Sequence, residues 1–237
     1  MYKMTNTVPF TAVMPDGKLK LHEAVALMTN CCQFQEHEEK GFRTFLTENN
    51  IAVFLFSLQI DILRVPEFKE EITTSVKIYG CKSIYGLRQL TIRDAAGELC
   101  MIANATGAFF DLKAQKAIKL APEQLNVKFD EPEEMECLPR KIPFPAADGI
   151  PCAEFTVRPS HLDMNGHLTS PIYFSAATDV LPAEFTYDRV RIEYKQQAKP
   201  GEVLYPYLYL DNGRAIVDLK SAGAVSYAAL EFTTREK

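Results

Sequence analysis

The sequence predicts an α+β protein built from two similar modules, each an antiparallel sheet packed around a helix. Three observations support this prediction. Apolar and polar residues alternate along many short segments, a helical segment precedes each group of them, and this order recurs after a proline-rich stretch. The chain has 237 residues, which suits one large domain or two small ones and can bury a sizeable core without disulfides or metal.

The first element of substance is a helical stretch over about 19–48. Apolar residues recur there at spacings of three and four, which predicts one buried helix face. We expect Gly41 to break or bend this helix, because glycine is a poor helix former. The residues that define the apolar face are Leu21, Ala24, Val25 and Met28.

Four strands are predicted after this helix. Apolar side chains occupy every second position over 54–62, the pattern recurs over 72–78 and 90–92, and 99–110 is almost wholly apolar. A period of two over successive segments predicts an antiparallel sheet with one solvent-facing side. The first of these strands would present Phe54, Phe56, Leu58, Ile60 and Ile62 on one face.

A segment rich in proline and acidic residues divides the chain. It contains Asp130-Glu131-Pro132-Glu133-Glu134 and further prolines at 139, 143 and 145, a composition that predicts a connector. A strand near 152–158, a helix near 168–180 and four further strands follow it. The sequence therefore predicts an N-terminal module over 1–125, a connector over 126–150 and a C-terminal module over 151–237.

Composition excludes several classes of function. The net charge of −5, from 26 basic and 31 acidic residues, argues against a nucleic-acid-binding protein. The longest apolar run, 51–58, is too short to cross a bilayer, and the N-terminus lacks the apolar core of a secretory signal. Six scattered cysteines without a Cys-x-x-Cys pair indicate reduced thiols. We therefore expect a cytoplasmic protein that needs no membrane and, lacking phosphate-binding loops, no cofactor.

The segment 158–168 carries the most chemical information. It places Asp163, Asn165 and His167 between a predicted strand and a predicted helix. A carboxylate, an amide and an imidazole near the unpaired N–H groups of a helix start suit a hydrolytic site. The alternative is that Asp163 and Asn165 only form the turn and cap the helix. A metal site from His161, Asp163 and His167 is disfavoured because no further clustered ligand is present, and no metal is expected.

This segment resembles a known signature. Asp163-Met164-Asn165-Gly166-His167, with Tyr173 six residues further on, resembles the D-x-N-x-H motif of the acyl-acyl carrier protein thioesterases. Ile192-Glu193-Tyr194-Lys195 resembles the L-E-Y-R segment of that family, and His37 with Gly41 resembles its H-x-x-x-G stretch. The likeness extends along most of the chain. It implies two tandem hotdog modules, each an antiparallel sheet wrapped around a long helix.

The resemblance also implies an activity, the hydrolysis of fatty acyl-acyl carrier protein thioesters to free fatty acid and carrier protein. In this scheme Asp163 activates water or attacks the carbonyl carbon, and Asn165 holds the carboxylate or the water. His167 would orient the thioester or stabilise negative charge, and Gln197 would donate a hydrogen bond to water. The acyl chain would lie in a cavity of the first module.

The sequence departs from the family pattern at four positions. Thr169 and Ser170 replace two asparagines, and Gln197 and Ala198 stand where the family has a glutamate and a cysteine. A thiol nucleophile at Ala198 is therefore ruled out. Two alternatives to the carrier-protein thioesterase stay open: a thioesterase acting on acyl-coenzyme A, and an acyl-binding hotdog protein whose site has lost catalysis.

The predicted partner is acyl carrier protein bearing a fatty acyl chain. Such carriers are acidic, so a chain of net charge −5 needs a local basic face to bind one. Arg158 and Lys199 are the candidates near the motif, and Tyr173 is a third candidate for contact with substrate. The sequence leaves a homodimer open. Further basic candidates are Arg140, Lys141 and Arg189.

Overall fold

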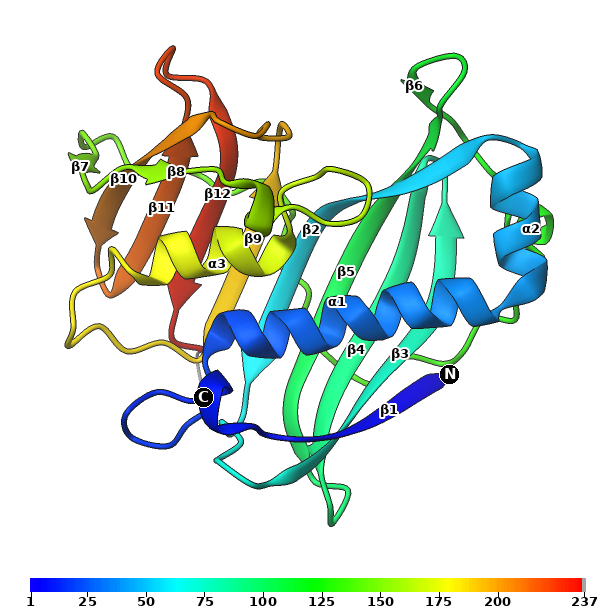
Figure 1. The fold of residues 1–237 in the computed structure, drawn as a ribbon, viewed down its shortest axis with the longest axis horizontal. Helices are drawn as coiled ribbons and strands as arrows, with labels where there is room; N and C mark the ends of the chain where they lie inside the picture. The colour runs from blue at the N-terminus through cyan, green and yellow to red at the C-terminus, as the bar shows by residue number, and fades with distance from the viewer. Residues whose placement is uncertain (236–237) are drawn as a thin grey trace. The chain divides into compact units, whose positions relative to one another are not determined.

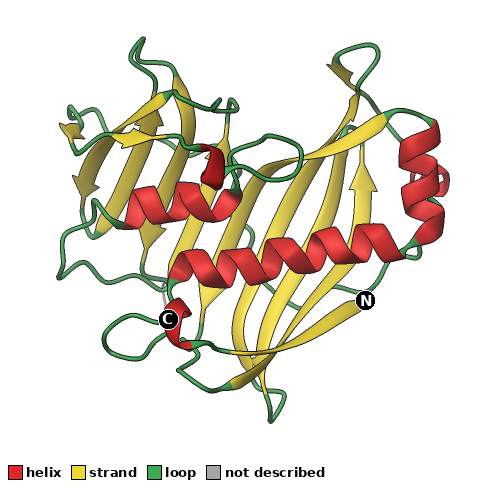
Figure 2. Ribbon diagram, in the orientation of Figure 1, coloured by secondary structure: helices red, strands yellow, loops and turns green. Residues whose placement is uncertain are grey.

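A computed structural model describes residues 1–235, which form two compact units of antiparallel sheet with few helices (Figures 1 and 2). Unit 1 contains residues 1–20 and 27–137, and unit 2 contains residues 21–26 and the chain from 138 onward. The antiparallel sheets and the few helices confirm the predicted α+β class. None of the described helices combines the length and the apolar character needed to cross a membrane.

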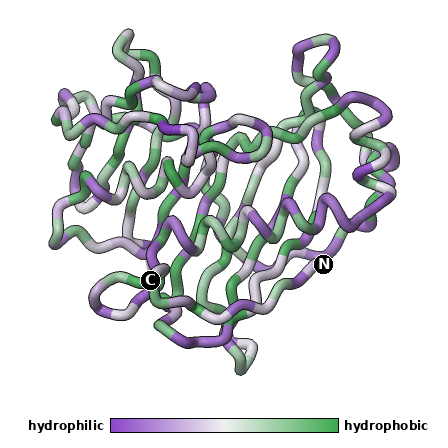
Figure 3. The backbone as a smooth tube through the Cα atoms, viewed as in Figure 1, coloured by the Kyte–Doolittle hydropathy of each residue, from purple (hydrophilic) through white to green (hydrophobic). Residues whose placement is uncertain are grey.

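The sheet of unit 1 has the strand order β1-β3-β4-β5-β2, with every neighbouring pair antiparallel. Hydrophobic residues concentrate along its strands while the loops are mostly hydrophilic (Figure 3). The prediction of one solvent-facing side is wrong for the middle of this sheet, because consecutive residues are buried over 58–62, 89–92 and 100–103. The strands are β1 (Tyr2–Thr7), β2 (Ile51–Ile62), β3 (Glu71–Lys82), β4 (Tyr85–Asp94) and β5 (Leu99–Asp111), with the short β6 (Lys116–Ala117) paired to β5.

A β-bulge corrects the predicted face of β2. Pairing with β5 shifts between Leu55 and Ser57, so the extra residue reverses the alternation at that point. Leu58, Ile60 and Ile62 are buried as predicted, but Phe54 precedes the bulge and lies on the other face, and Phe56 is the extra residue of the bulge; both are only half-buried. Leu55 takes their place on the inner face.

The predicted helix over 19–48 is two helices, α1 (Leu21–Glu38) and α2 (Lys40–Glu48). The break falls at Glu39, whose ψ of 79° is non-helical, and Gly41 lies inside the first turn of α2. A Cβ on Gly41 would be 2.6 Å from Nδ2 of Asn126, so glycine here permits close packing and does not end the helix. The Leu27–Glu38 part of α1 crosses the unit 1 sheet (Figure 1), with Cys31 Sγ 3.7 Å from the carbonyl oxygen of Thr74.

Unit 2 has the strand order β9-β12-β11-β10-β7, again antiparallel throughout, and one helix, α3 (Ser170–Thr178), lies across it (Figure 1). Phe174 and Ala177 of α3 are fully buried, which fixes the helix on the sheet. The strands are β7 (Ile150–Pro151), β8 (Phe155–Thr156, paired to β10), β9 (Arg189–Tyr194), β10 (Val203–Asp211), β11 (Arg214–Lys220) and β12 (Ser226–Thr233). Three short 3-10 helices complete the described chain: η1 (Phe10–Ala12), η2 (Pro122–Leu125) and η3 (Pro159–His161).

Residues 126–149, here called the strap, form no helix or strand but are held to the sheets by side chains. In unit 1 the side-chain amide of Gln89 is buried and makes two hydrogen bonds to the backbone of Glu133. Its Oε1 accepts from the Glu133 N–H at 2.7 Å, and its Nε2 donates to the Glu133 carbonyl at 2.8 Å. The Glu133 carboxylate also pairs with Lys77 and Arg93. In unit 2, Ile142 is buried in a cluster of strap and sheet residues. Gln89 and Arg88 are adjacent residues of β4, so their side chains point to opposite faces of the sheet. The strap therefore lies on the face opposite to Arg88.

Candidate active site

The Asp163–His167 segment forms a closed turn between η3 and α3. Leu162 and Leu168 pair as an antiparallel bridge at its base, and the N–H of Asp163 donates to the carbonyl of His167 at 2.8 Å. Gly166 adopts a φ of 76°, the left-handed conformation that glycine takes without strain. The turn brings Asp163, Asn165 and His167 together, with Asp163 and Asn165 exposed and His167 half-buried.

The two oxygens of the Asp163 carboxylate differ in their bonding. Oδ1 accepts the backbone N–H of Asn165 at 2.8 Å and that of His167 at 2.9 Å. Oδ2 has no hydrogen-bond partner among residues 1–235. The first oxygen thus fits the turn-forming alternative, since it satisfies two backbone donors. The second oxygen is left available for a proton or a carbonyl carbon, as the catalytic alternative requires.

Unit 1 contains the same backbone turn with its carboxylate at a different position. Val13 and Leu19 pair as the equivalent bridge, the Met14 N–H donates to the Lys18 carbonyl at 2.8 Å, and Gly17 has a φ of 83°. Met14 stands where unit 2 has Asp163, Asp16 where it has Asn165, and Lys18 where it has His167. The backbone closes the same way with methionine at the position of Asp163, and the Asp16 carboxylate, two residues further on, accepts the Lys18 N–H at 3.1 Å.

Gln197 and Tyr173 lie in one part of unit 2. Gln197 is exposed in the turn between β9 and β10. Tyr173 is buried, with 3% of its surface exposed, and its ring meets that of Tyr194 edge to face at 5.5 Å. Burial raises the pKa of Tyr173 to about 12, against a smaller lowering effect from the backbone N–H of Ala198. Tyr173 therefore holds α3 against the Gln197–Ala198 turn from inside the unit.

Arg158 and Lys199 are both exposed and lie on neighbouring segments. The N–H of Val157 donates to the carbonyl of Glu202 at 2.9 Å, and the N–H of Gly201 donates back to Val157 at 2.9 Å. These two bonds join the chain before the motif turn to the chain after Gln197, so the two basic residues lie on hydrogen-bonded segments of unit 2.

Unit 1 contains an apolar cavity of about 100 Å³ that sequence reasoning located only by module. Glycines on three adjacent strands, Gly80, Gly86 and Gly107, form part of its wall, and Gly86 lies directly opposite Gly107. A Cβ on Gly86 would be 3.0 Å from the Phe109 ring, so the missing side chains leave the space open. Glycine inside predicted strands was the available signal. The apolar lining includes Met28, Val53, Leu55, Leu58, Leu90 and Phe109.

One ion pair lies in the lining of this cavity, beside the polar residues Thr29 and Gln33. Arg88 Nη2 lies 3.1 Å from Glu36 Oε2, and the guanidinium lies 5.9 Å from the ring centre of Phe42. Cys32 also lines the cavity next to Arg88, and burial raises the pKa of its thiol. Sequence reasoning missed this pair, because Arg88 and Glu36 are 52 residues apart.

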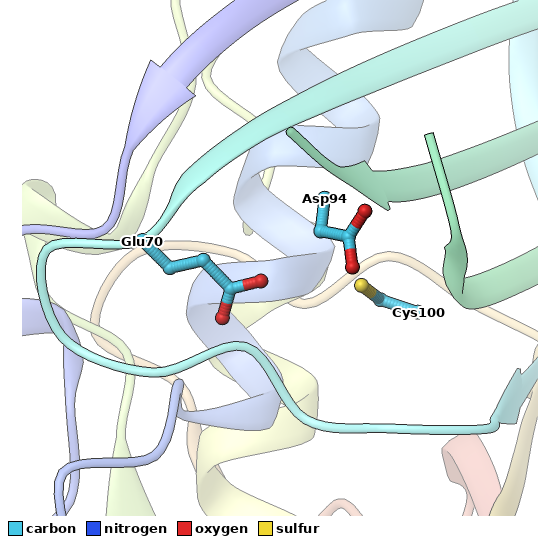
Figure 4. A group of neighbouring side chains, drawn as sticks. All are labelled: Glu70, Asp94 and Cys100. Atoms are coloured by element: carbon cyan, nitrogen blue, oxygen red, sulfur yellow. The ribbon is translucent and has the colours of Figure 1, made fainter. Parts of the chain in front are cut away.

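A second cluster of ionisable groups lies at the end of the unit 1 sheet, where Glu70, Asp94 and Cys100 approach one another (Figure 4). Arg64 donates to all three, at 2.9 Å to Glu70 Oε2, 3.0 Å to Asp94 Oδ2 and 3.1 Å to Cys100 Sγ. Hydrogen bonding to Arg64 lowers the pKa of Glu70, and the backbone N–H of Glu98, followed by Arg64, lowers that of Asp94. The arginine supplies the positive charge here, so the cluster is a structural ion-pair network.

Comparisons with known proteins agree with this architecture. Residues 1–127 match the model of the acyl-ACP thioesterase N-terminal domain, and residues 148–216 match that of the acyl-ACP thioesterase C-terminal domain. Among solved structures, an acyl-ACP thioesterase from Bacteroides thetaiotaomicron aligns with a TM-score of 0.79 at 18% identity, covering 98% of this chain and 96% of that one. The 12:0-ACP thioesterase from Umbellularia californica aligns with a TM-score of 0.80 at 14% identity, covering 100% and 97%.

These structural likenesses establish a shared fold. A comparison with curated protein sequences gave no match. The family assignment rests on the two domain models, which match consecutive parts of the chain in the order that the family has them. The chain thus belongs to the acyl-ACP thioesterase family, and it is a thioester hydrolase that acts on fatty acyl groups carried by acyl carrier protein.

Proposed function

We propose that Asp163 is the residue that drives thioester hydrolysis in this chain. The observation that carries the proposal is the unequal bonding of its carboxylate: two N–H groups fix Oδ1, and Oδ2 has no partner among the described residues. The turn of unit 1 closes with Met14 in the place of Asp163, so an aspartate at this position is not required for the backbone turn. Oδ2 of Asp163 is available for chemistry.

The reaction follows from this arrangement. Oδ2 of Asp163 takes a proton from water while the water oxygen attacks the thioester carbonyl carbon. The carbonyl oxygen becomes an oxyanion, which the His167 side chain stabilises, and the Asn165 amide holds the water. The C–S bond then breaks, and the carrier thiolate recovers the proton from Asp163. Direct attack by Asp163 would give an anhydride that water hydrolyses to the same products.

Gln197 has a limited role in this scheme. Its amide can donate a hydrogen bond to water but cannot remove a proton, because a neutral amide is not a base at neutral pH. Ala198 offers no nucleophile. The scheme therefore uses Asp163 as its one base.

The fold in this proposal is a pair of tandem hotdog modules over residues 1–125 and 151–237, joined by the connector 126–150. The matching turns at Met14–Lys18 and Asp163–His167 support a duplication, since each has the same bridge, the same hydrogen bonds and a left-handed glycine. The cavity of unit 1 would receive the acyl chain, because it is lined by apolar side chains from the α1 helix and the sheet.

The carrier is proposed to bind through a basic face that includes Arg158 and Lys199, which lie on joined segments of unit 2. Electrostatic contacts of this kind mainly affect encounter, so they should show in KM at low salt. Acyl-coenzyme A, the alternative carrier, is compared in the same assay. Reversing both charges should raise KM for the protein carrier without changing kcat.

The decisive test compares Asp163→Asn with Asp16→Asn, the same substitution in the matching turn of unit 1. Release of free thiol from palmitoyl, lauroyl and butyryl thioesters is followed on both carriers. We expect Asp163→Asn to lose about a hundredfold or more in kcat, and Asp16→Asn to keep wild-type activity. Full activity of Asp163→Asn would contradict the proposal. Absence of thiol release by the wild type on either carrier would favour the acyl-binding alternative.

A further inference from the structure

We propose that His161 is a positioning residue for the reaction, acting by fastening the base of the Asp163–His167 turn. This inference rests on the proposed function, because it takes Asp163 as the reacting group. The imidazole Nδ1 lies 3.0 Å from the backbone nitrogen of Arg158, and the ring stacks on that of Phe155 with centres 5.0 Å apart and planes 26° apart. No role was predicted for this histidine beyond the disfavoured metal site.

His161 holds the two ends of the turn at once. Its backbone N–H donates to the Arg158 carbonyl at 2.9 Å, on the chain that enters the turn. Its carbonyl accepts the Thr169 N–H at 3.0 Å, on the chain that leaves it. Phe155, under the imidazole, belongs to β8, which pairs with Leu204 of β10. The ring thereby connects the base of the turn to the sheet of unit 2.

The Arg158 bond fixes the chemical state of the imidazole. A backbone N–H can only donate, so Nδ1 must accept and the ring proton must reside on Nε2. The side chain then accepts one hydrogen bond while its ring stacks on Phe155. A residue without an acceptor at this place would leave the Arg158 N–H without its partner.

Unit 1 again supplies the comparison. Ala12 occupies the position of His161 and makes the same two backbone bonds, from its N–H to the Pro9 carbonyl at 3.1 Å and from the Lys20 N–H to its carbonyl at 2.9 Å. Pro9 stands in place of Arg158 and has no N–H to satisfy. The turn of unit 1 therefore closes without an imidazole at the position of Ala12 and without a backbone N–H at the position of Pro9. The hydrogen bond between a histidine side chain and the base of the turn is therefore present in unit 2, the unit that carries Asp163.

The consequence for catalysis is geometric. Asp163 is two residues beyond His161, and its Oδ1 is bonded to the N–H groups of Asn165 and His167. A shift at the base of the turn would move all three side chains together relative to the thioester. Misplacement by about 1 Å can cost up to a hundredfold in rate without weakening substrate binding.

The test separates the acceptor from the ring. His161→Asn retains an acceptor near the position of Nδ1, whereas His161→Phe retains the stacked ring and loses the acceptor. His37→Phe, at an exposed histidine of α1, is the matched control. Steady-state kinetics with palmitoyl-acyl carrier protein and thermal melting are measured for all three, with Asp163→Asn alongside.

We expect His161→Phe to lose about tenfold in kcat with KM within twofold of wild type, and His161→Asn and His37→Phe to retain at least half of kcat. If the His161→Phe variant does not fold, His161→Leu, which also lacks an acceptor, takes its place, and the same loss of kcat is expected. Equal activity of His161→Phe and wild type, or equal losses in the Phe and Asn variants, would overturn the inference. An active Asp163→Asn would instead refute the proposed function itself.

Discussion

Carboxylates in this protein are distinguished by what holds each oxygen. Glu70 and Asp94 both bond to the Arg64 guanidinium, which lowers the pKa of Glu70 and contributes to lowering that of Asp94. Asp163 instead has one oxygen held by backbone N–H groups and the other without a described partner. The first arrangement stabilises structure by ion pairing, and the second fixes a carboxylate without neutralising it. The bonding pattern, more than the residue type, therefore identifies the candidate base.

Cys31 gives a prediction about pH. It is fully buried on α1, and burial raises the pKa of its thiol to about 12, with a smaller effect of Cys32. In the unfolded chain the thiol ionises near pH ~8.5. The folded state therefore keeps its proton where the unfolded state loses it, and its contribution to stability, complete below pH ~8.5, is lost as the pH rises towards 12.

Urea titrations at pH 8, 9, 10 and 11 check this prediction. The free energy of unfolding should fall with pH in the wild type and fall less steeply in Cys31→Ala, with Cys152→Ala as the matched control. Parallel pH dependences for Cys31→Ala and the wild type would show that the prediction is wrong.

Hydrolysis should also survive iodoacetamide, because the proposed mechanism uses no thiol.

At the scale of elements, the packing of α2 against η2 depends on a small residue. Gly41 lies in the first turn of α2, and a Cβ there would meet Nδ2 of Asn126 at 2.6 Å and its carbonyl oxygen at 3.3 Å. Asn126 itself has a φ of 48°, a conformation that glycine would also adopt without cost. Helix propensity favours alanine at position 41, and the contact with Asn126 opposes it.

A double-mutant cycle separates these two effects. Gly41→Ala alone should lower the free energy of unfolding by about 1 kcal/mol, because the contact outweighs the gain in helix propensity. In an Asn126→Gly background the same change should raise it by about 1 kcal/mol, since the crowding side chain is gone. Denaturant titrations measure both values, and identical effects in the two backgrounds would refute the packing explanation.

At the scale of the whole molecule, side chains of the sheet hold the strap by hydrogen bonds to its backbone. Gln89, only 4% exposed, offers one donor and one acceptor to the backbone of Glu133, as a neighbouring strand would. Gln59 donates to the Glu136 carbonyl at 2.7 Å in the same way. These bonds explain how a segment rich in proline and acidic residues is ordered without secondary structure.

Gln89→Leu should therefore loosen the strap. The change leaves the N–H and the carbonyl of Glu133 without partners, at a cost of about 1–3 kcal/mol in the free energy of unfolding. Proteolysis within 126–149 should become faster. Thr91→Val, at the next position on the same face of β4, removes a bond to Ser75 and serves as control. Equal cleavage rates in the two variants would contradict this role of Gln89.

Local patterns in the sequence were sufficient for the motif and for much of the fold. The turn at 163–167 is a short segment whose spacing alone brings its side chains together, and the strands followed from alternation. The face of Phe54 and Phe56 was predicted wrongly, because the β-bulge at Leu55–Ser57 reverses the alternation and leaves no local trace. The Arg88–Glu36 pair could not be foreseen, since it depends on how α1 crosses β4.

The turn at Met14–Lys18 has a consequence for relatives of this protein. It shows that this backbone closes with methionine, aspartate and lysine at the three positions that matter in the other copy, with the Asp16 carboxylate accepting the Lys18 N–H. A descendant can therefore exchange the catalytic side chains and still form the turn. Measured turnover will therefore distinguish catalytically active relatives from inactive ones, whereas expression level and melting temperature will not.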